Sequence, residues 1–245
     1  MNINTELIIN KKYEGVISNR LVKISQEYRV LAVLRYLFPG KYEQMKHGDK
    51  PDLQDTINRI GIEVTTAVQE DDMKASRTFA EIDKSSRENL QKSLDKIKKC
   101  GYEIYDTSGI MHIVKSGTIE AEKNCLCNAI LKKCKKANNY EKDFKVIGLA
   151  VLFPDNPTRQ TEEDIIKWIK ELHPEIEQYY KFVYVISSQF CLMYDIKSEN
   201  IDKKILDKTV NRLLWTIARM TAEGEITLES DEWKCTINHS NIINV

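Results

Sequence analysis

Apolar and polar residues alternate along the chain in patterns that predict helices and strands in an order typical of an α/β fold. Apolar residues at helical spacing predict amphipathic helices at about 23–38, 74–99, 118–138, 161–173 and 202–222. Runs rich in β-branched and aromatic residues predict strands at 60–68, 145–153, 182–186 and 190–194, with a hairpin over 101–114. The helix at 202–222 is expected to bury Ile205, Val210, Leu213, Ile217 and Met220. The tail after it is expected to end in short strands.

Two neighbouring strands follow the first helix, and each carries one acid. Asp52 stands at the start of the first strand. In the second strand, alternation with a period of two places Ile62 and Val64 on one face and Glu63 and Thr65 on the other. A tight turn between the strands would bring the start of one beside the middle of the next. The sequence therefore predicts that Asp52 and Glu63 form a pair of carboxylates.

Such a pair suits Mg²⁺ or Mn²⁺. Magnesium takes hard oxygen ligands and receives few of them from the protein, so water and phosphate oxygens complete its octahedron. A metal ion held there would polarise a phosphodiester and lower the pKa of a bound water. The carboxylate pair therefore points to metal-assisted hydrolysis of a phosphodiester.

The motifs Pro51-Asp52 and Glu63-Val64-Thr65 resemble those of the PD-(D/E)XK phosphodiesterase superfamily, which has the restriction-endonuclease-like fold. The core of that fold runs α-β-β-β-α-β, with acids on the second and third strands. The resemblance implies a mixed central sheet flanked by helices and C-terminal additions within a single α/β domain, 1–245. The matching elements are the helix at 23–38, the strand pair at 50–68, the helix at 118–138 and the strand at 145–153. Residues 23–153 would then be a nuclease-like core and 154–245 its extension.

The same resemblance assigns roles to further residues. Glu27 in the first helix corresponds to an additional acid that helps to hold the metal in many members of the superfamily. The segment 130–140 looks like their lysine-bearing second core helix. The chain departs from the pattern at Thr65, where the superfamily carries a lysine that stabilises the transition state. A displaced lysine would have to supply this charge, and the candidates are Lys74, Lys84 and Lys133. Of these, Lys133 is the expected catalytic residue.

Each candidate also has a structural interpretation. Asp52 would cap a turn after Pro51, and Glu63 would lie on an exposed edge strand beside a lysine or arginine. Glu27 would be a solvated acid in the first turn of a helix, favoured by the helix dipole. His47, in the loop before the strand pair, would either contact substrate or metal or, as is common for a lone loop histidine, be solvated.

The charges cancel over the whole chain but separate along it. The 245 residues include 37 basic and 37 acidic side chains, 42% are hydrophobic, and the mean hydropathy is −0.45. This composition excludes a disordered or fibrous chain and argues against a protein that coats nucleic acid or membrane by bulk attraction. Basic residues concentrate at 84–99 and 132–136, and acidic ones at 223–232. We expect the two basic helices to contact nucleic acid through Lys92, Lys96, Lys132 and Lys136.

No apolar run approaches the roughly 20 residues of a membrane-spanning helix, and the N-terminus lacks the pattern of a signal peptide. We therefore expect a cytoplasmic protein with no membrane partner. In that compartment the six cysteines would be reduced thiols. Cys125, Cys127 and Cys134 lack both a nearby histidine and a fourth ligand for zinc.

Two functional hypotheses follow. The first is a metal-dependent nuclease that hydrolyses DNA phosphodiester bonds, and the resemblance would place it in restriction, phage defence or DNA processing. The alternative is a catalytically inactive nuclease-like module that binds nucleic acid or a protein partner, which Thr65 favours. A homodimer, or a complex with another protein, is compatible with either hypothesis.

Overall fold

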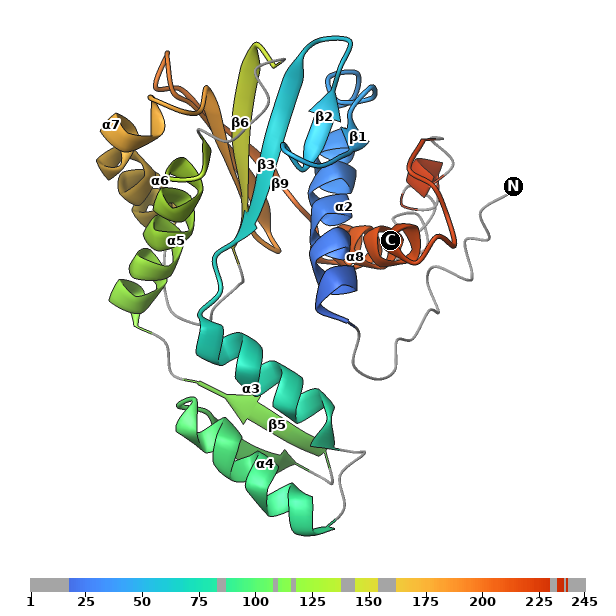
Figure 1. Ribbon diagram of the computed structural model, residues 1–245, viewed down its shortest axis with the longest axis vertical. Coiled ribbons are helices and arrows are strands. Elements are labelled where there is room, and N and C mark those ends of the chain that lie inside the picture. The colour runs from blue at the N-terminus through green and yellow to red at the C-terminus, as the bar shows by residue number, and fades with distance from the viewer. Residues whose placement is uncertain are drawn as a thin grey trace.

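The structure, a computed structural model, describes residues 18–82, 87–107, 110–115, 118–137, 144–153, 162–229, 233–235 and 237. Within these ranges a mixed sheet of seven strands lies at the centre, in the order β1-β2-β3-β6-β7-β8-β9 (Figure 1). The strands are β1 (Lys46–His47), β2 (Leu53–Asp55), β3 (Ile60–Thr66), β6 (Val146–Leu152), β7 (Phe182–Ile186), β8 (Phe190–Asp195) and β9 (Ile201–Ile205).

The strand directions divide the sheet into three parts. β1, β2 and β3 form an antiparallel meander. β3, β6 and β7 are parallel, and β8 and β9 return antiparallel. β6 has a parallel neighbour on each side, whereas β7 has parallel β6 on one side and antiparallel β8 on the other. Both strands are covered on both faces, which explains their nearly continuous apolar sequences. The predicted α/β class and the mixed sheet flanked by helices are confirmed.

One face of the sheet is covered by α2 (Asn19–Leu37) and α8 (Lys208–Ala222), which also pack against each other (Figure 1). The Ser18 side chain accepts a hydrogen bond from the Leu21 amide at 3.2 Å and so caps the start of α2. Leu31, Ile62 and Leu214 are buried together in the layer between these helices and the sheet.

The other face is covered by α5 (Ile119–Cys134), α6 (Glu162–Glu171) and α7 (His173–Ile176). The Thr118 side chain accepts a hydrogen bond from the Ala121 amide at 3.1 Å and caps α5. Ile130, Leu149 and Trp168 belong to the apolar layer on this side. The sheet therefore has a separate core on each face.

A lobe of four elements is inserted between β3 and α5 and extends away from the sheet (Figure 1). Its elements are α3 (Glu70–Ala80), α4 (Arg87–Lys99), β4 (Glu103–Thr107) and β5 (Ile110–Val114). The predicted hairpin is confirmed as the antiparallel pair β4 and β5. The single helix predicted at 74–99 is wrong: the chain forms two helices there. Because α4 folds back against α3, Ala75 and Ile97 are both fully buried, which one continuous helix would not allow.

The helix predicted at 202–222 begins later than expected. Its first part is the strand β9, which extends the sheet along β8, and α8 begins only at Lys208. Asp207 sets this boundary, because its carboxylate accepts hydrogen bonds from the amides of Thr209 and Val210 at 2.8 and 3.2 Å. Ile205, predicted to face the core, is instead 67% exposed at the sheet edge.

Only a small part of the tail is described. Residues 233–235 form a helical turn, and the short strands expected at the end of the chain fall mainly on residues outside the described ranges. Trp233 is fully buried and joins the core beneath α2 and α8. Across the described ranges, every helix is too short or too polar to cross a bilayer.

Glu122, in the first turn of α5, is a buried acid. Neither of its carboxylate oxygens accepts a hydrogen bond within the described part of the chain, and burial raises its pKa to about 7 from an ordinary value of 4.5. The folded protein therefore binds this proton more tightly than the unfolded chain does. Consequently, the free energy of unfolding is expected to fall as the pH rises from about 4.5 to about 7.

Glu122→Gln should remove this dependence and raise the free energy of unfolding by about 1–3 kcal/mol at pH 8, with little change at pH 4. Urea unfolding at both pH values measures the effect. Glu120→Gln, in the same turn but exposed, is the matched control and should change neither value. If Glu122→Gln raised the free energy of unfolding equally at pH 4 and pH 8, the pH dependence would not come from the Glu122 carboxylate.

Candidate functional site

Glu63 lies in the middle of β3, which pairs with β2 on one side and β6 on the other. Its side chain is only 5% exposed. The neighbours Ile62 and Val64 point into the core beneath α2 and α8, as the alternation predicts. The alternative position on an exposed edge strand is therefore wrong.

Asp52 immediately precedes β2 and is also buried. Its Oδ2 atom accepts a hydrogen bond from the Val64 amide at 2.9 Å, which ties the carboxylate to β3. Gly61 makes this approach feasible, because a Cβ atom there would come within 2.4 Å of Pro51 Cγ. The glycine thus lets the segment that carries Asp52 lie close against β3.

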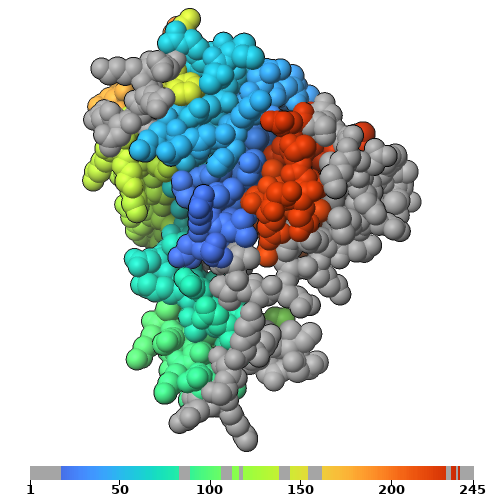
Figure 2. Space-filling view, turned by 45° about the vertical axis from the view of Figure 1, so that its right-hand side comes forward, coloured from blue at the N-terminus to red at the C-terminus, as the bar shows by residue number. Residues whose placement is uncertain are grey.

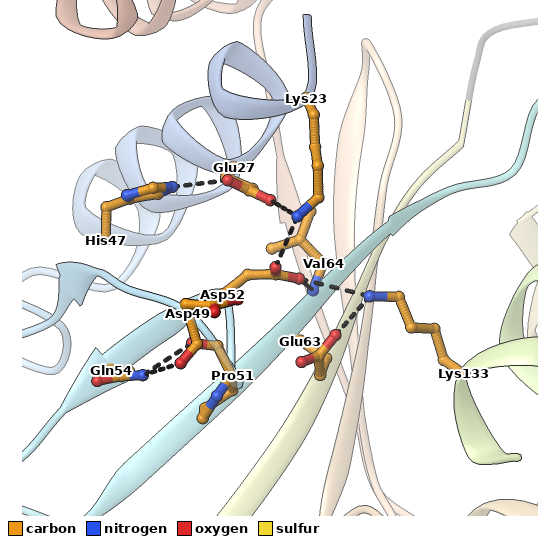
Figure 3. A network of polar contacts seen from close by, with 10 residues as sticks. All are labelled: Lys23, Glu27, His47, Asp49, Pro51, Asp52, Gln54, Glu63, Val64 and Lys133. Atoms are coloured by element: carbon orange, nitrogen blue, oxygen red, sulfur yellow. Dashed lines mark hydrogen bonds and ion pairs between the residues drawn. The ribbon is translucent and has the colours of Figure 1, made fainter. Parts of the chain in front are cut away.

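Lys133 reaches both carboxylates from α5 (Figure 3). Its Nζ atom lies 3.4 Å from Asp52 Oδ2 and forms an ion pair with Glu63 Oε2. The lysine side chain is 19% exposed, so the ammonium is held in a partly buried position. Three elements, α5, β3 and the start of β2, therefore meet at one charged cluster.

Glu27 extends the cluster on the side of α2 (Figure 3). Its Oε1 atom lies 2.9 Å from Lys23 Nζ, and the same ammonium lies 3.4 Å from Asp52 Oδ1. Glu27 Oε2 contacts His47 Nε2 at 2.6 Å, and the His47 ring stacks on Tyr28 with centroids 4.9 Å apart. Glu27 is 3% exposed, so the interpretation as a solvated acid of the first turn is wrong.

The two central carboxylates differ in proton affinity. Burial alone would raise the pKa of Asp52, but Lys133, the Val64 amide and Lys23 together hold this pKa below its ordinary value. For Glu63, burial and the charge of Asp52 outweigh the attraction of Lys133, so its pKa is raised. The pair therefore consists of a firmly ionised aspartate and a glutamate that binds a proton more readily.

A groove of about 630 Å³ runs between the end of β3 and α5. Thr65, two residues from Glu63 on the same face of β3, lines one wall, and Asn124, Asn128 and Lys132 line the other. Apart from Lys132, these four side chains are neutral and able to hydrogen-bond. The groove therefore offers polar contacts along α5, at residues next in sequence to the cluster, and Glu70 of α3 adds one acid to its lining.

The other predicted lysines lie elsewhere. Lys74 is on α3, where it pairs with Glu70 and Asp71, and Lys84 lies outside the described residues. Lys92 and Lys96 are exposed on α4 in the lobe, which Figure 1 shows apart from α5. Lys132 is exposed on α5, the helix that carries Lys133, and Lys136 is exposed in the turn that follows this helix.

Lys23 is the member of the cluster that the sequence reasoning missed. It precedes Glu27 by four residues on a predicted helix, the spacing at which ion pairs form along a helix, so this signal was present. Its contact with Asp52 is different, because the two residues are 29 apart in the sequence and meet only when α2 packs beside the strands.

The donors suit a hard cation, although they do not form a ready metal cage. No group of three or more His, Cys, Asp or Glu side chains close enough to hold a metal ion occurs in the described ranges. Glu27 Oε1 is buried and accepts no hydrogen bond there; its charge is met by the Lys23 ammonium. Lys23 is 65% exposed, so its ammonium can leave the carboxylates for solvent. Two carboxylates with water are a donor set that Mg²⁺ accepts.

Comparison with known proteins adds no relative to this description. No protein-family model, curated protein or solved structure matches the chain. The features of the chain that bear on its function are therefore the surfaces described above and the charged cluster, which consists of Asp52, Glu63, Lys133, Lys23 and Glu27.

Proposed function

We propose that this chain is a metal-dependent nuclease that hydrolyses DNA phosphodiester bonds and has a PD-(D/E)XK-like core. The observation that carries the proposal is the position of Lys133, whose ammonium contacts both Asp52 and Glu63. This lysine supplies, from α5, the positive charge that Thr65 cannot supply from β3. The departure from the superfamily pattern is thereby compensated within the same cluster.

The arrangement of elements supports the same interpretation. α2, the meander β1-β2-β3, α5 and β6 follow one another in the order α-β-β-β-α-β, interrupted by the lobe between β3 and α5. Asp52 stands at the start of the second strand of this series and Glu63 in the third. This order supports the proposed resemblance, which rests on the two short motifs and on the order of the predicted elements.

Each residue has a role in the proposed reaction. Asp52 and Glu63 would hold Mg²⁺ or Mn²⁺, with Glu27 contributing through water; the ion would polarise the phosphate and lower the pKa of a bound water. Lys133 would place its charge beside the phosphate, where negative charge develops in the transition state. The groove beside Thr65 and Lys132 would hold the adjoining nucleotides. Restriction, phage defence and DNA processing are the settings in which such an activity would serve.

Incubation with single-stranded DNA, duplex DNA and RNA, each with Mg²⁺, Mn²⁺ or EDTA, tests the proposal. We expect cleavage of DNA that requires the metal and is lost in Asp52→Asn and Glu63→Gln. Asp55→Asn is the matched control, because Asp55 is equally buried and its carboxylate, within the described residues, accepts hydrogen bonds from Asn58 alone. Cleavage that persists at the same rate in both site variants would refute the assignment.

One observation favours a second candidate, a catalytically inactive module that binds nucleic acid or a protein partner. The carboxylates are already paired with two lysines, Lys23 and Lys133, and such pairing can stabilise a fold without any metal. Calorimetry with Mn²⁺ separates the candidates. A nuclease should bind the ion in a manner that Asp52→Asn abolishes, whereas the inactive module should give no heat that depends on this carboxylate.

A further inference from the structure

The outer face of α8 carries a stripe of basic residues with a tryptophan at its centre. Lys208, Arg212, Trp215 and Arg219 follow at intervals of four, three and four residues, so they lie along one side of the helix. We call these four residues the α8 stripe. Lys208, Arg212 and Trp215 are exposed, and Trp215 keeps 37% of its surface accessible. Trp215 therefore presents part of its ring between two cations, Arg212 and Arg219.

The α8 stripe lines a groove of about 710 Å³, together with Ser188 and Thr216. Arg29 of α2 lies over the Trp215 ring, with its guanidinium carbon 5.1 Å from the ring centroid. The Arg29 guanidinium also donates a hydrogen bond to Asn211 Oδ1 at 3.1 Å. A cation thus packs against the indole ring and orients it in the groove.

The balance of charge at the groove is positive. Within the described residues, neither the Lys208 ammonium nor the Arg212 guanidinium takes part in an ion pair. The nearby acids are engaged: Asp207 caps α8 through its carboxylate, and Glu223 pairs with Arg219 at 3.1 Å. Lys208 and Arg212 are therefore able to meet an anionic ligand.

This groove lies on a different side of α2 from the carboxylate cluster. Glu27 and Arg29 are two residues apart on α2, which separates their directions by about 200° around the helix axis. Figure 2 shows the surface of α2 (blue) directly beside that of the C-terminal segment (red), in line with the packing of α2 against α8. A ligand on the α8 stripe would thus use contacts separate from those at Asp52 and Glu63.

We propose that the α8 stripe binds single-stranded nucleic acid, with phosphates on Lys208 and Arg212 and a base stacked on Trp215. Phosphate-binding cations beside an aromatic platform are the combination that recognises an unpaired strand. A duplex fits less well, because its bases are stacked on one another and do not offer a free face. The stripe extends about 16 Å along the helix, longer than one nucleotide, so a strand can use more of it than a mononucleotide can.

The inference goes beyond cleavage and does not depend on it. Binding at α8 requires neither a metal ion nor the carboxylate cluster, so it can be measured in EDTA. If Asp52→Asn abolishes cleavage, binding at α8 should still be observed. If a variant of the α8 stripe abolishes binding there, the cleavage rate at saturating substrate should stay the same.

Tryptophan fluorescence gives a direct reading of the site. The chain has three tryptophans, and Trp168 and Trp233 are 4% and 0% exposed, so quenching by a ligand in solution reports mainly Trp215. We expect oligothymidylate of about 12 nucleotides, a length within the range that such surfaces bind, to quench the emission in EDTA. In Trp215→Phe the quenching should disappear, while anisotropy of a labelled strand still shows binding.

Variants then test the contacts. Anisotropy of a labelled strand measures the affinity. We expect it to fall about tenfold or more in the double variant Lys208→Gln/Arg212→Gln and also in Trp215→Ala. The control is Lys197→Gln, which replaces an exposed lysine in the turn between β8 and β9 and should leave the affinity unchanged. The double variant should also reduce the slope of log affinity against log salt by about 1.4, at about 0.7 per phosphate contact in a single strand. Circular dichroism verifies that each variant is folded.

Three results with other ligands would overturn the inference. The protein would bind a duplex of the same length as tightly as it binds oligothymidylate, or it would bind thymidine monophosphate as tightly, or it would bind anionic lipid vesicles and not oligothymidylate. Unchanged affinity in the double variant would exclude the α8 stripe as the binding surface.

Discussion

Lys133→Met is expected to reduce metal-dependent DNA cleavage at least about 100-fold. The methionine keeps much of the apolar stem but removes the ammonium that lies between Asp52 and Glu63. In the proposed reaction this charge opposes the negative charge that develops on the phosphate, and loss of one such group typically costs a factor of about 10²–10³ in rate. Single-turnover cleavage of a labelled duplex, with enzyme in excess, measures the effect on chemistry.

Lys170→Met is the matched control, because Lys170 is an exposed lysine on α6, on a different helix from the cluster. Its rate should equal that of the unmodified protein. Circular dichroism and urea unfolding must show that Lys133→Met is folded at the assay temperature. If the folded Lys133→Met variant cleaves at the unmodified rate, then Lys133 is a structural counter-ion and the catalytic charge has another source.

Arg35→Met is expected to lower the free energy of unfolding by roughly 3–5 kcal/mol, the largest effect on stability that we predict. Arg35 is 4% exposed and lies in the last turn of α2. Its guanidinium donates to the backbone carbonyls of Tyr42, Glu43 and Met45 at 3.2, 3.0 and 2.6 Å, and also to that of Leu228. The variant would remove the arginine donor from all four carbonyls, of which that of Tyr42 keeps the Met45 amide at 3.2 Å. Each acceptor left unpaired costs about 1–3 kcal/mol unless water reaches it.

Urea unfolding followed by circular dichroism measures this loss. Arg20→Met, an exposed arginine in the first turn of the same helix, should change the free energy of unfolding by less than about 0.5 kcal/mol. Arg35→Lys should recover only part of the stability, because a single ammonium cannot reproduce the forked donors of arginine. A midpoint for Arg35→Met equal to that of the unmodified protein would show that the four carbonyls need no donor.

The placement of Asp52 beside Glu63 followed from local rules. Alternation along β3 directs Glu63 away from Ile62 and Val64, and a short turn brings the start of β2 next to β3. Both features depend on residues within one hairpin, where sequence spacing translates directly into distance. The position of Lys133, 70 residues from Glu63, was expected only through the resemblance to a known fold.

Other features depend on contacts that the local pattern does not encode. β1 has two residues, too few for any periodicity to show. β9 alternates only weakly, and no glycine or proline separates it from α8, so the apolar spacing predicts one helix over both. The cap at Asp207 is the local signal that divides them. Arg35 stands within an apolar stretch of α2, and its role depends on carbonyls supplied by a loop and by Leu228, 193 residues away. Tertiary packing decides β1 and the role of Arg35, whereas the start of α8 has a local signal in the cap at Asp207.

The lobe between β3 and α5 also affects the free energy of assembling the charged cluster. Contact between Glu63 and Lys133 brings together the ends of a segment of 70 residues. If this segment were flexible, the length-dependent part of the chain entropy lost on closing it would cost roughly 4 kcal/mol. A folded lobe has already confined much of this segment, so less chain entropy remains to be lost when α5 docks on the sheet. Any ligand or substitution that loosens the lobe should therefore weaken the contact of Lys133 with Glu63 without touching either residue.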